Sequence, residues 1–190
     1  MKKINDTIFI AGGGTGGHLF PAITIGNELK KHNIKIYYIG SKFGIEKDFF
    51  EKYNLDYYLL NIKGIQRELN FNSIIKNLLL PLYLIISYIQ SFRLIKKHKP
   101  LAIIGTGGYC SGLPLFTGIT MNIPTFIQDQ NSIPGIITKI LNKRVKKIFT
   151  GYDISKKINN ENCIVSGNPI RSEIIEIEKN KAREILGFDK

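Results

Sequence analysis

The sequence is short of cysteine, of acidic residues and of apolar stretches long enough to cross a membrane. Its two cysteines are too few for a disulfide scaffold or a four-thiolate zinc site, which favours a reducing, cytoplasmic setting. The amino terminus lacks the long apolar stretch and the small-residue cleavage site of a secretory signal, so export is not expected. Helix-turn-helix, zinc-finger and RNA-recognition patterns are absent too, which argues against a nucleic-acid-binding protein.

Basic residues outnumber acidic ones by 27 to 15 among the 190 residues, a formal net charge of +12. A surplus of this size suggests an anionic partner: a nucleic acid, an acidic lipid surface or a phosphorylated substrate. The alternative is a broad compositional bias whose charges stay solvated. With 43% hydrophobic residues, the chain is long enough and apolar enough to fold as one domain.

Short apolar runs alternate with longer helical stretches along the chain. Repeated strand-helix-strand units of this kind predict an α/β fold, a Rossmann-like parallel sheet with helices on both faces. Ligands of such sheets collect beyond the carboxyl ends of the strands, so the loops there are the ones to inspect. The expected strands are residues 7–11, 34–39, 57–60, 101–105, 125–128, 147–149 and 163–165. The expected helices are residues 21–31, 44–53, 71–97, 113–121, 135–141 and 174–186.

A glycine-rich loop, residues 12–18, follows the first expected strand directly. Glycines allow positive φ and let backbone N–H groups approach an anion, and the helix end that follows adds a favourable dipole, so a phosphate-bearing ligand is expected. The loop also satisfies the dinucleotide pattern G-x-G-x-x-G, but residues 29–45 contain no acidic side chain to hold a ribose hydroxyl. Ser41 and Lys42 suit a 2′-phosphate instead. An NADP-dependent oxidoreductase therefore stays open as an alternative, as does a turn that serves only packing.

His18 closes this loop at its junction with the helix. A histidine near the positive end of a helix tends to stay neutral, and it is then available as a general base. A purely structural role is the alternative for a single histidine.

Further polar loops follow later strands, at what should be the same edge of the sheet. Residues 106–112 form a second glycine-rich loop, in which Tyr109 and Ser111 offer hydroxyl groups to a sugar or phosphate, or else pack the loop and cap a helix. Residues 128–131 present four amide or carboxylate side chains, which suit sugar hydroxyls better than a metal. Arg171 follows a rigid Gly-Asn-Pro turn and could clasp a phosphate. Together these loops predict one cleft.

Residues 78–86 are strongly apolar and precede a basic cluster that ends at Lys99. The uncharged run falls short of the roughly 18 residues that span a bilayer, and Pro81 should kink a helix there. An apolar helix beside basic residues is typical of an element that lies on an anionic membrane surface. A core helix with a solvated basic end is the alternative.

Four of these motifs, in this order, resemble the MurG family of bacterial glycosyltransferases. The matching stretches are residues 11–22, 107–112, 128–131 and 167–171. The resemblance implies the amino-terminal half of a GT-B enzyme, which transfers N-acetylglucosamine from UDP-N-acetylglucosamine to undecaprenyl-linked muramoyl-pentapeptide, turning lipid I into lipid II in peptidoglycan synthesis with inversion at the anomeric carbon. It also implies a peripheral enzyme at the cytoplasmic face of the plasma membrane, with no redox cofactor and no catalytic metal.

The resemblance further implies how the donor is held. Thr15, Gly16 and Gly17 are expected to contact the UDP-sugar from the first loop. Asn131 and Arg171 are expected to reach it from across the cleft.

For the acceptor, the resemblance implies that His18 is the base that activates the hydroxyl group, while Tyr109 and Ser111 help to hold the diphosphate or the sugar. The family's third motif typically reads His-Glu-Gln-Asn, whereas Gln128 and Asp129 occupy its first two positions here. Asp129 keeps the negative charge with a shorter reach, so it is the second candidate for acid–base work.

Residues 1–172 are expected to form the Rossmann-like, acceptor-binding domain, and residues 173–190 a terminal helix that leads toward the family's donor-binding domain. That second domain should begin after Gly187, where the sequence stops. The chain is therefore expected to have little or no transferase activity alone and to need a donor-binding half, which a separate chain could supply. A non-catalytic module that holds a polyprenyl diphosphate at the membrane is the alternative from another functional class, and a UDP-sugar epimerase is a further one.

Overall fold

The computed structural model describes residues 6–65, 77–171, 174 and 178–188. Its centre is a sheet of seven strands in the order β3-β2-β1-β4-β5-β6-β7, and every neighbouring pair is parallel. The first six strands have the order of a doubly wound nucleotide-binding fold, so the expected Rossmann-like architecture is confirmed. The strands are β1 (Thr7–Ala11), β2 (Lys35–Ser41), β3 (Tyr57–Leu60), β4 (Ala102–Gly105), β5 (Thr125–Asp129), β6 (Lys147–Thr150) and β7 (Cys163–Val165).

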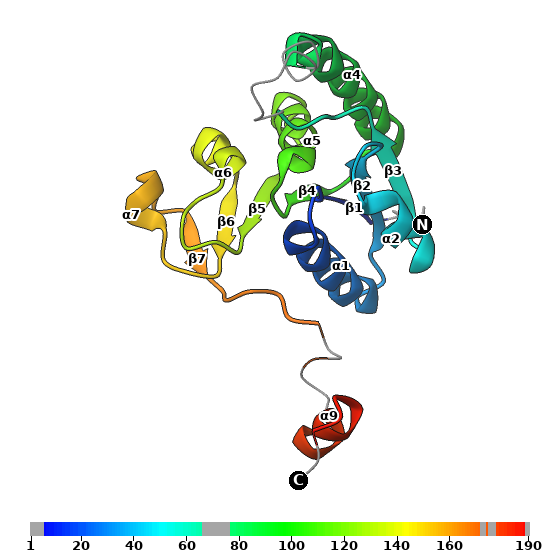
Figure 1. The fold of residues 1–190 in the computed structure, drawn as a ribbon. Helices are drawn as coiled ribbons and strands as arrows, with labels where there is room; N and C mark the ends of the chain where they lie inside the picture. The colour runs from blue at the N-terminus through cyan, green and yellow to red at the C-terminus, as the bar shows by residue number, and fades with distance from the viewer. Residues whose placement is uncertain (1–5, 66–76, 172–173, 175–177, 189–190) are drawn as a thin grey trace.

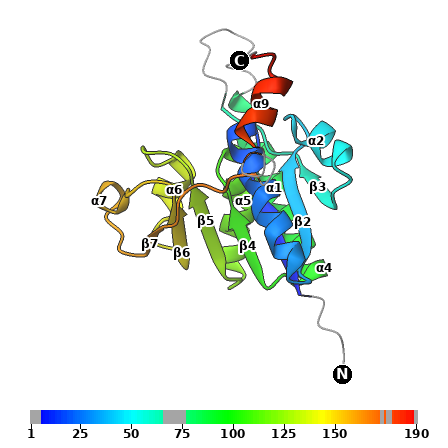
Figure 2. The same ribbon diagram turned by 90° about the horizontal axis from the view of Figure 1, so that it is seen from below.

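Helices cover both faces of the sheet (Figure 1). The helices are α1 (Gly16–Lys31), α2 (Glu46–Lys52), α4 (Leu80–His98), α5 (Tyr109–Thr120), α6 (Ile136–Leu141), α7 (Ser155–Ile158) and α9 (Lys179–Ile185). Figures 1 and 2 show α1 on one face, and α4 and α5 on the other. This placement follows from the right-handed crossovers of parallel strands, because the chain winds one way from β1 to β3 and the opposite way from β4 to β7.

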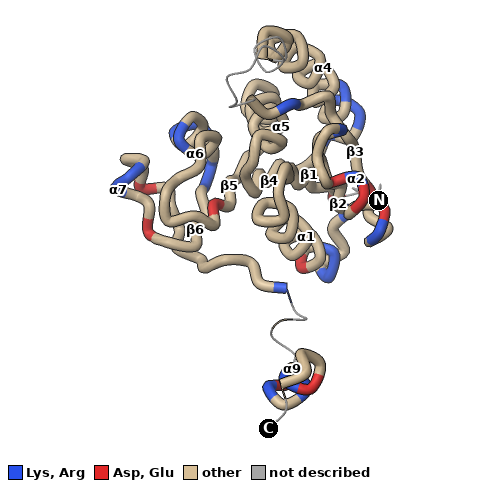
Figure 3. Tube along the Cα trace, in the orientation of Figure 1, with Lys and Arg blue, Asp and Glu red and all other residues tan. Residues whose placement is uncertain are grey.

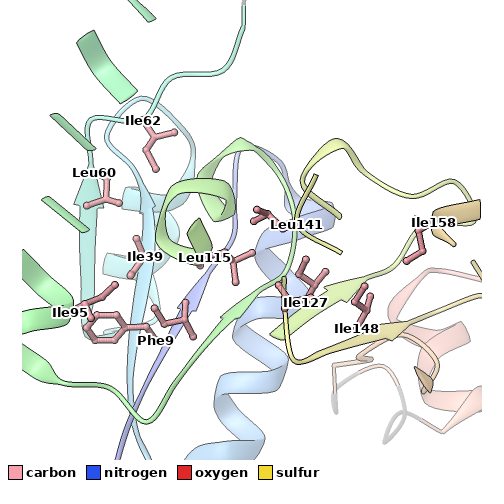
Figure 4. Packing of buried hydrophobic residues seen from close by; sticks show 13 residues of the cluster. Phe9, Ile39, Leu60, Ile62, Ile95, Leu115, Ile127, Leu141, Ile148 and Ile158 are labelled. Carbon is pink, nitrogen blue, oxygen red and sulfur yellow. The ribbon is translucent and has the colours of Figure 1, made fainter. Parts of the chain in front are cut away.

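The core has two parts, one on each face of the sheet, because side chains of a strand point alternately to its two faces. On the inner strand β1, Phe9 packs into the cluster that includes Leu115 of α5. Its neighbour Ile10 packs into the other cluster, with Leu19 of α1 and Phe50 of α2. Figure 4 shows the first cluster, which runs under α4, α5 and α6 along the sheet. Both faces being covered explains why the strands have nearly continuous apolar sequences.

Two helices begin earlier than the sequence patterns suggest. The patterns place helix starts at residues 21 and 113, but α1 begins at Gly16 and α5 at Tyr109. Pro21 and Pro114 lie inside these helices, at the sixth position of each. A proline at that position lacks an N–H group, and it therefore leaves the carbonyl oxygen four residues earlier without its helical donor.

The apolar stretch around residue 80 is helical, as expected, but its start differs. Residues 66–76, which include the beginning of the helix expected at 71–97, lie outside the described residues. Pro81 stands in the first turn of α4, where a missing N–H is tolerated, and a turn at Leu79 separates α4 from the helical residues 77 and 78. The short helix α7 has no counterpart among the expected elements, and α9 represents the expected terminal helix. Over the described ranges, no helix has the length and apolarity required to traverse a bilayer.

Candidate functional site

The first glycine loop joins the end of β1 to the start of α1. Gly14 has φ +84°, a left-handed conformation that favours glycine. Thr15 is the exposed N-cap residue of α1, and its side chain makes no capping hydrogen bond. Gly16 and Gly17 form the start of the helix. These three residues therefore lie where helical N–H groups favour an anion.

A buried carboxylate lies beneath this loop, and the sequence analysis did not identify it. Glu46, the first residue of α2, is completely buried. Its Oε1 accepts hydrogen bonds from the Gly14 N–H at 2.5 Å and from the Cys110 thiol at 3.0 Å. A side chain at Gly13 or Gly44 would collide with Glu46, so both glycines make room for it. Gly44, two residues before Glu46, is the nearest sequence signal for it.

Glu46 also influences the chemistry of Cys110. Burial, and then the nearby Glu46 carboxylate, raise the pKa of this thiol well above its ordinary value. Cys110 therefore stays protonated and donates to the carboxylate rather than acting as a nucleophile. Glu46 thus connects the first glycine loop to the first turn of α5.

The two glycine loops lie side by side, as their positions after the neighbouring strands β1 and β4 predict. Thr106, directly after β4, donates its hydroxyl group to the carbonyl oxygen of His18 at 2.7 Å. Its backbone N–H bonds to the carbonyl oxygen of Ala11 at 2.9 Å. Gly107 and Gly108 have φ +99° and +71°, and a side chain on Gly107 would lie 2.5 Å from the His18 ring. The second loop is therefore shaped around the imidazole.

His18 is half-buried between three segments of the chain. Its Nδ1 lies 3.1 Å from the carbonyl oxygen of Thr106 and 2.6 Å from Nε2 of Gln130. The same Gln130 nitrogen donates to the carbonyl oxygen of Gly17 at 2.8 Å. The loops after β1, β4 and β5 thus meet at one histidine.

The third polar loop is organised by Asp129, which is 3% exposed. Its Oδ1 accepts hydrogen bonds from the backbone and side-chain nitrogens of Asn131, at 3.1 and 3.0 Å. Its Oδ2 accepts from the Gly135 N–H at 2.9 Å and the Thr138 hydroxyl at 2.6 Å. Asp129 therefore holds the loop together, while its expected acid–base role stays a prediction. Gln128, beside it, is also buried, and its amide bonds to no described residue.

Tyr109 and Ser111 lie in the first turn of α5 rather than in the loop before it. Ser111 is fully buried and its hydroxyl donates to the carbonyl oxygen of Gly108 at 3.0 Å, so it packs the loop, while the N-cap of α5 is Gly108, without a side-chain cap. Direct contact with a substrate would require this turn to move. The ring of Tyr109 packs against Gly14 and Gly64. Burial raises the pKa of Tyr109 to about 12, so its phenol is a hydrogen-bond donor at neutral pH.

An open groove of about 490 Å³ runs beside the start of α1. The guanidinium group of Arg171 lies 4.4 Å from the centre of the Phe20 ring in this groove. The groove thereby brings Arg171 together with Gly16 and Gly17, as the sequence analysis expected. Asn131 is exposed at the third loop, with its amide directed to Asp129.

The end of β2 does not support a dinucleotide site. Ser41, expected to receive a 2′-phosphate in the NADP alternative, is fully buried. Its hydroxyl donates to the carbonyl oxygen of Ile62 at 2.7 Å and accepts from the Phe43 N–H at 2.9 Å. The residue therefore serves the turn after β2. The described part of the chain contains no group of three or more histidine, cysteine or acidic side chains placed to hold a metal ion.

Residues 8–150 match the model of the glycosyltransferase family 28 N-terminal domain. The chain belongs to this family. The matched region of this family 28 domain runs from β1 to the end of β6, and so includes both glycine loops, Glu46 and the Asp129 loop.

Curated relatives agree with this membership. The family 28 domain is 36% identical over 187 residues to the UDP-N-acetylglucosamine--N-acetylmuramyl-(pentapeptide) pyrophosphoryl-undecaprenol N-acetylglucosamine transferase of Clostridioides difficile (strain 630), a match over 95% of this chain and 45% of that protein. It is 37% identical over 185 residues to the protein of the same name from Flavobacterium psychrophilum, over 95% of this chain and 49% of that one. The chain spans about half the length of the curated relatives that it matches.

A solved structure gives the same result for the fold. The crystal structure of Acinetobacter baumannii MurG superposes with a TM-score of 0.71 at 20% identity, over 90% of this chain and 47% of that one. The resemblance to the MurG family is therefore confirmed, and the chain corresponds to the amino-terminal half of a GT-B fold.

Proposed function

We propose that this family 28 domain is the acceptor-binding half of an enzyme that transfers N-acetylglucosamine from UDP-N-acetylglucosamine to lipid I, giving lipid II. One observation carries the proposal: the glycine loops after β1 and β4 meet around His18, in a chain that is 36% identical to a transferase of that name. The half-buried histidine lies at the carboxyl edge of the sheet, where ligands of this fold bind.

The proposed base is His18. It takes the proton of the acceptor hydroxyl as the oxygen attacks the anomeric carbon of the donor, and UDP leaves from the opposite side, which inverts that carbon. Tyr109 donates its phenol O–H, which is protonated at neutral pH, to the acceptor diphosphate. Ser111 and Asp129 act by holding the second and third loops in shape.

The donor is proposed to bind along the groove at the start of α1. Thr15, Gly16 and Gly17 offer the amino end of the helix to the diphosphate, and Arg171 adds a positive charge beside them. Asn131 approaches from the third loop. Residues 1–172 form this acceptor domain, and the remaining donor contacts belong to a second domain, present in relatives of about twice the length.

The membrane attachment proposed for this domain rests on the unusual pattern of α4. The helix buries Ser87, Ser91 and Ile95, whereas most of the apolar side chains in its first half face outward. A helix that only filled the core would show the reverse pattern. The exposed apolar residues of α4 are Leu82, Leu84, Ile85, Ile89 and Phe92.

Basic residues border this apolar face. Arg93 and Lys96 line a hollow of about 440 Å³ together with Ile89 and Phe92. Figure 3 shows further basic residues on α6 and on the segment that follows it, on the same side of the sheet. An apolar face with a basic margin suits a membrane with anionic headgroups. We therefore place the enzyme as a peripheral protein at the cytoplasmic face of the plasma membrane, where a polyprenyl-linked acceptor is anchored.

Reconstitution tests the activity. The chain is mixed with the separately produced carboxyl-terminal half of the C. difficile relative, and lipid II is measured from labelled UDP-N-acetylglucosamine and lipid I in vesicles. Lipid II should form only when both halves are present, because half of a GT-B enzyme lacks most contacts to UDP. Full turnover by the 190-residue chain alone would refute the need for a second half.

The same vesicles test the alternative of a non-catalytic polyprenyl-diphosphate-binding module. Binding of the chain to lipid I vesicles without any lipid II, even when the other half is supplied, would favour that module.

The double variant Ile85→Ser/Ile89→Ser should bind anionic vesicles at least about tenfold more weakly, because it removes apolar contact from the membrane face. Ile164→Ser, at an exposed apolar position of β7, is the matched control. Equal binding of all three proteins would contradict a membrane role for α4.

A further inference from the structure

The Nδ1 atom of His18 faces two groups with opposite requirements. The carbonyl oxygen of Thr106, at 3.1 Å, can only accept a hydrogen bond. The side-chain nitrogen of Gln130, at 2.6 Å, can only donate one. A neutral imidazole nitrogen carries either a proton or a lone pair, so Nδ1 satisfies one of these groups at a time.

The orientation of the Gln130 amide follows from a proline in α1. Pro21 has no N–H, so the carbonyl oxygen of Gly17 lacks its helical donor. Gln130 Nε2 supplies the missing donor at 2.8 Å. The reversed amide would bring Oε1 against that carbonyl oxygen, which places two acceptors in contact. One N–H of the amide is therefore committed to Gly17, and the other is directed to His18.

We propose that Gln130 is a positioning residue that selects the tautomer of His18. While its amide bridges Gly17 and His18, Nδ1 accepts a hydrogen bond and the imidazole proton is on Nε2. When a ligand draws the amide away, Nδ1 gains a proton and donates to Thr106. The two forms interconvert through water: Nδ1 takes a proton from solvent and Nε2 releases one, with no net change.

This inference rests on the proposed function, in which His18 acts as a base. Nε2 makes no hydrogen bond within the described ranges of the chain, so it is the nitrogen left for the substrate. It can take the acceptor proton only in the second tautomer, because in the first it already carries one. Gln130 thereby keeps the base inactive until its amide is engaged, and the ligand group that engages it is a hydroxyl or acetamido oxygen that accepts the N–H.

The tautomer is observable without substrate or activity, by ¹⁵N NMR of the 190-residue chain labelled at its three histidines, at a pH where they are neutral. The His18 signals are assigned by their loss in His18→Gln. The wild-type chain should show the proton on Nε2. In Gln130→Leu, which cannot donate, the protonated signal should move to Nδ1. Gln90→Ala, which changes a glutamine on α4, is the control and should match the wild type.

A second variant reaches the same state without changing Gln130. Pro21→Ala restores an N–H that can bond to Gly17, so it competes with the Gln130 amide and should also move the His18 proton toward Nδ1. The inference is overturned if His18 keeps one tautomer in all these proteins while the His32 and His98 signals show an intact fold. The proposed function has a separate test. If the tautomer responds as expected but the two-half assay yields no lipid II, the proposed function fails and the inference about Gln130 and the His18 tautomer stands.

Discussion

The two junctions between glycine loop and helix follow the same local pattern and have different uses. Each loop leads into a helix with proline at the sixth position, and the third helical residue is His18 in α1 and Ser111 in α5. The backbone N–H of each bonds to the carbonyl oxygen of the N-cap residue, at 3.2 and 3.3 Å. Yet His18 is half-buried between loops, and Ser111 is completely buried. Local sequence pattern therefore specifies the turn, while packing around it decides whether its side chain meets a ligand.

Glu46 explains part of this difference. Its carboxylate is placed under the first loop by α2 and receives the Cys110 thiol from the second junction. The second junction is thus packed inward against α2 and the first loop, whereas the first remains at the surface beside the groove.

The largest expected difference is in the loss of activity on substitution of His18 compared with substitution of Ser111. In the two-half lipid II assay, His18→Ala should lower kcat by about 10²–10⁴-fold, because a general base contributes about that much. Ser111→Ala should keep activity within a few-fold and lose about 1 kcal/mol of unfolding free energy, from its hydrogen bond to Gly108. Wild-type turnover by His18→Ala would remove the base assignment.

Loss of Glu46 should be the next largest effect. Glu46→Ala leaves the Gly14 N–H and the Cys110 thiol without their acceptor and opens a cavity, which should cost about 2–4 kcal/mol in urea unfolding. Glu46→Gln retains the size and one acceptor oxygen and should lose less. Asp48→Ala, exposed in the same helix, is the control, with a change of about 1 kcal/mol or less. Similar losses for Glu46→Ala and Asp48→Ala would show that the buried carboxylate does not support the loops.

Substitution of glycine by alanine should change the stability of the protein by different amounts at the two junctions. Gly107→Ala places a side chain at φ +99°, and 2.5 Å from His18 Nδ1, so it should destabilise by about 1–2 kcal/mol and displace the imidazole. Gly17→Ala meets nothing closer than 3.7 Å and should be neutral or stabilising by up to about 1 kcal/mol. Thermal unfolding of both variants checks this pair, and equal melting temperatures would count against a second loop shaped around His18.

The smallest expected effect is a pH dependence at Tyr109. Burial raises its pKa from 10.0 to about 12, which means that the folded state favours the neutral phenol. The stabilisation is complete below the unfolded pKa and is lost as pH rises from about 10 to 12. Tyr109→Phe should therefore lose less stability than the wild type over that window, measured by urea unfolding. Tyr152→Phe, on the exposed surface, is the control substitution. If the unfolding free energy of Tyr109→Phe depended on pH as that of the wild type does, the burial of this phenol would be contradicted.

Much of the fold was predictable because strands in a parallel sheet carry strong local signals. All seven strands lie within a few residues of the apolar runs that predict them, and for the inner strands this is because burial on both faces requires continuous apolar sequence. Helix starts were less predictable. Pro21 and Pro114 resemble helix-initiating prolines, and nothing in the local sequence shows that the helices already begin in the glycine loops.

The site was predictable only in part. The convergence of the two glycine loops follows from parallel strands, whose carboxyl ends share one edge of the sheet and which the alternation of elements predicts. The meeting of Arg171 with the start of α1 was expected from the family resemblance. Glu46 was missed because the groups that it binds are 32 and 64 residues away in sequence. The role of Gln130 was not predictable for the same reason, since its contacts with Gly17 and His18 join residues more than a hundred positions apart.

By itself, the sequence determined the parallel sheet, the two glycine-rich turns and the family, because each depends on residue types at short spacing. The tertiary structure alone decided that Ser111 and Asp129 are enclosed, that Glu46 supports the first loop, and that a single histidine meets both Gln130 and Thr106. The physical reason is that burial and hydrogen-bond partners are set by distances through space, and those depend on how distant strands are ordered in the sheet.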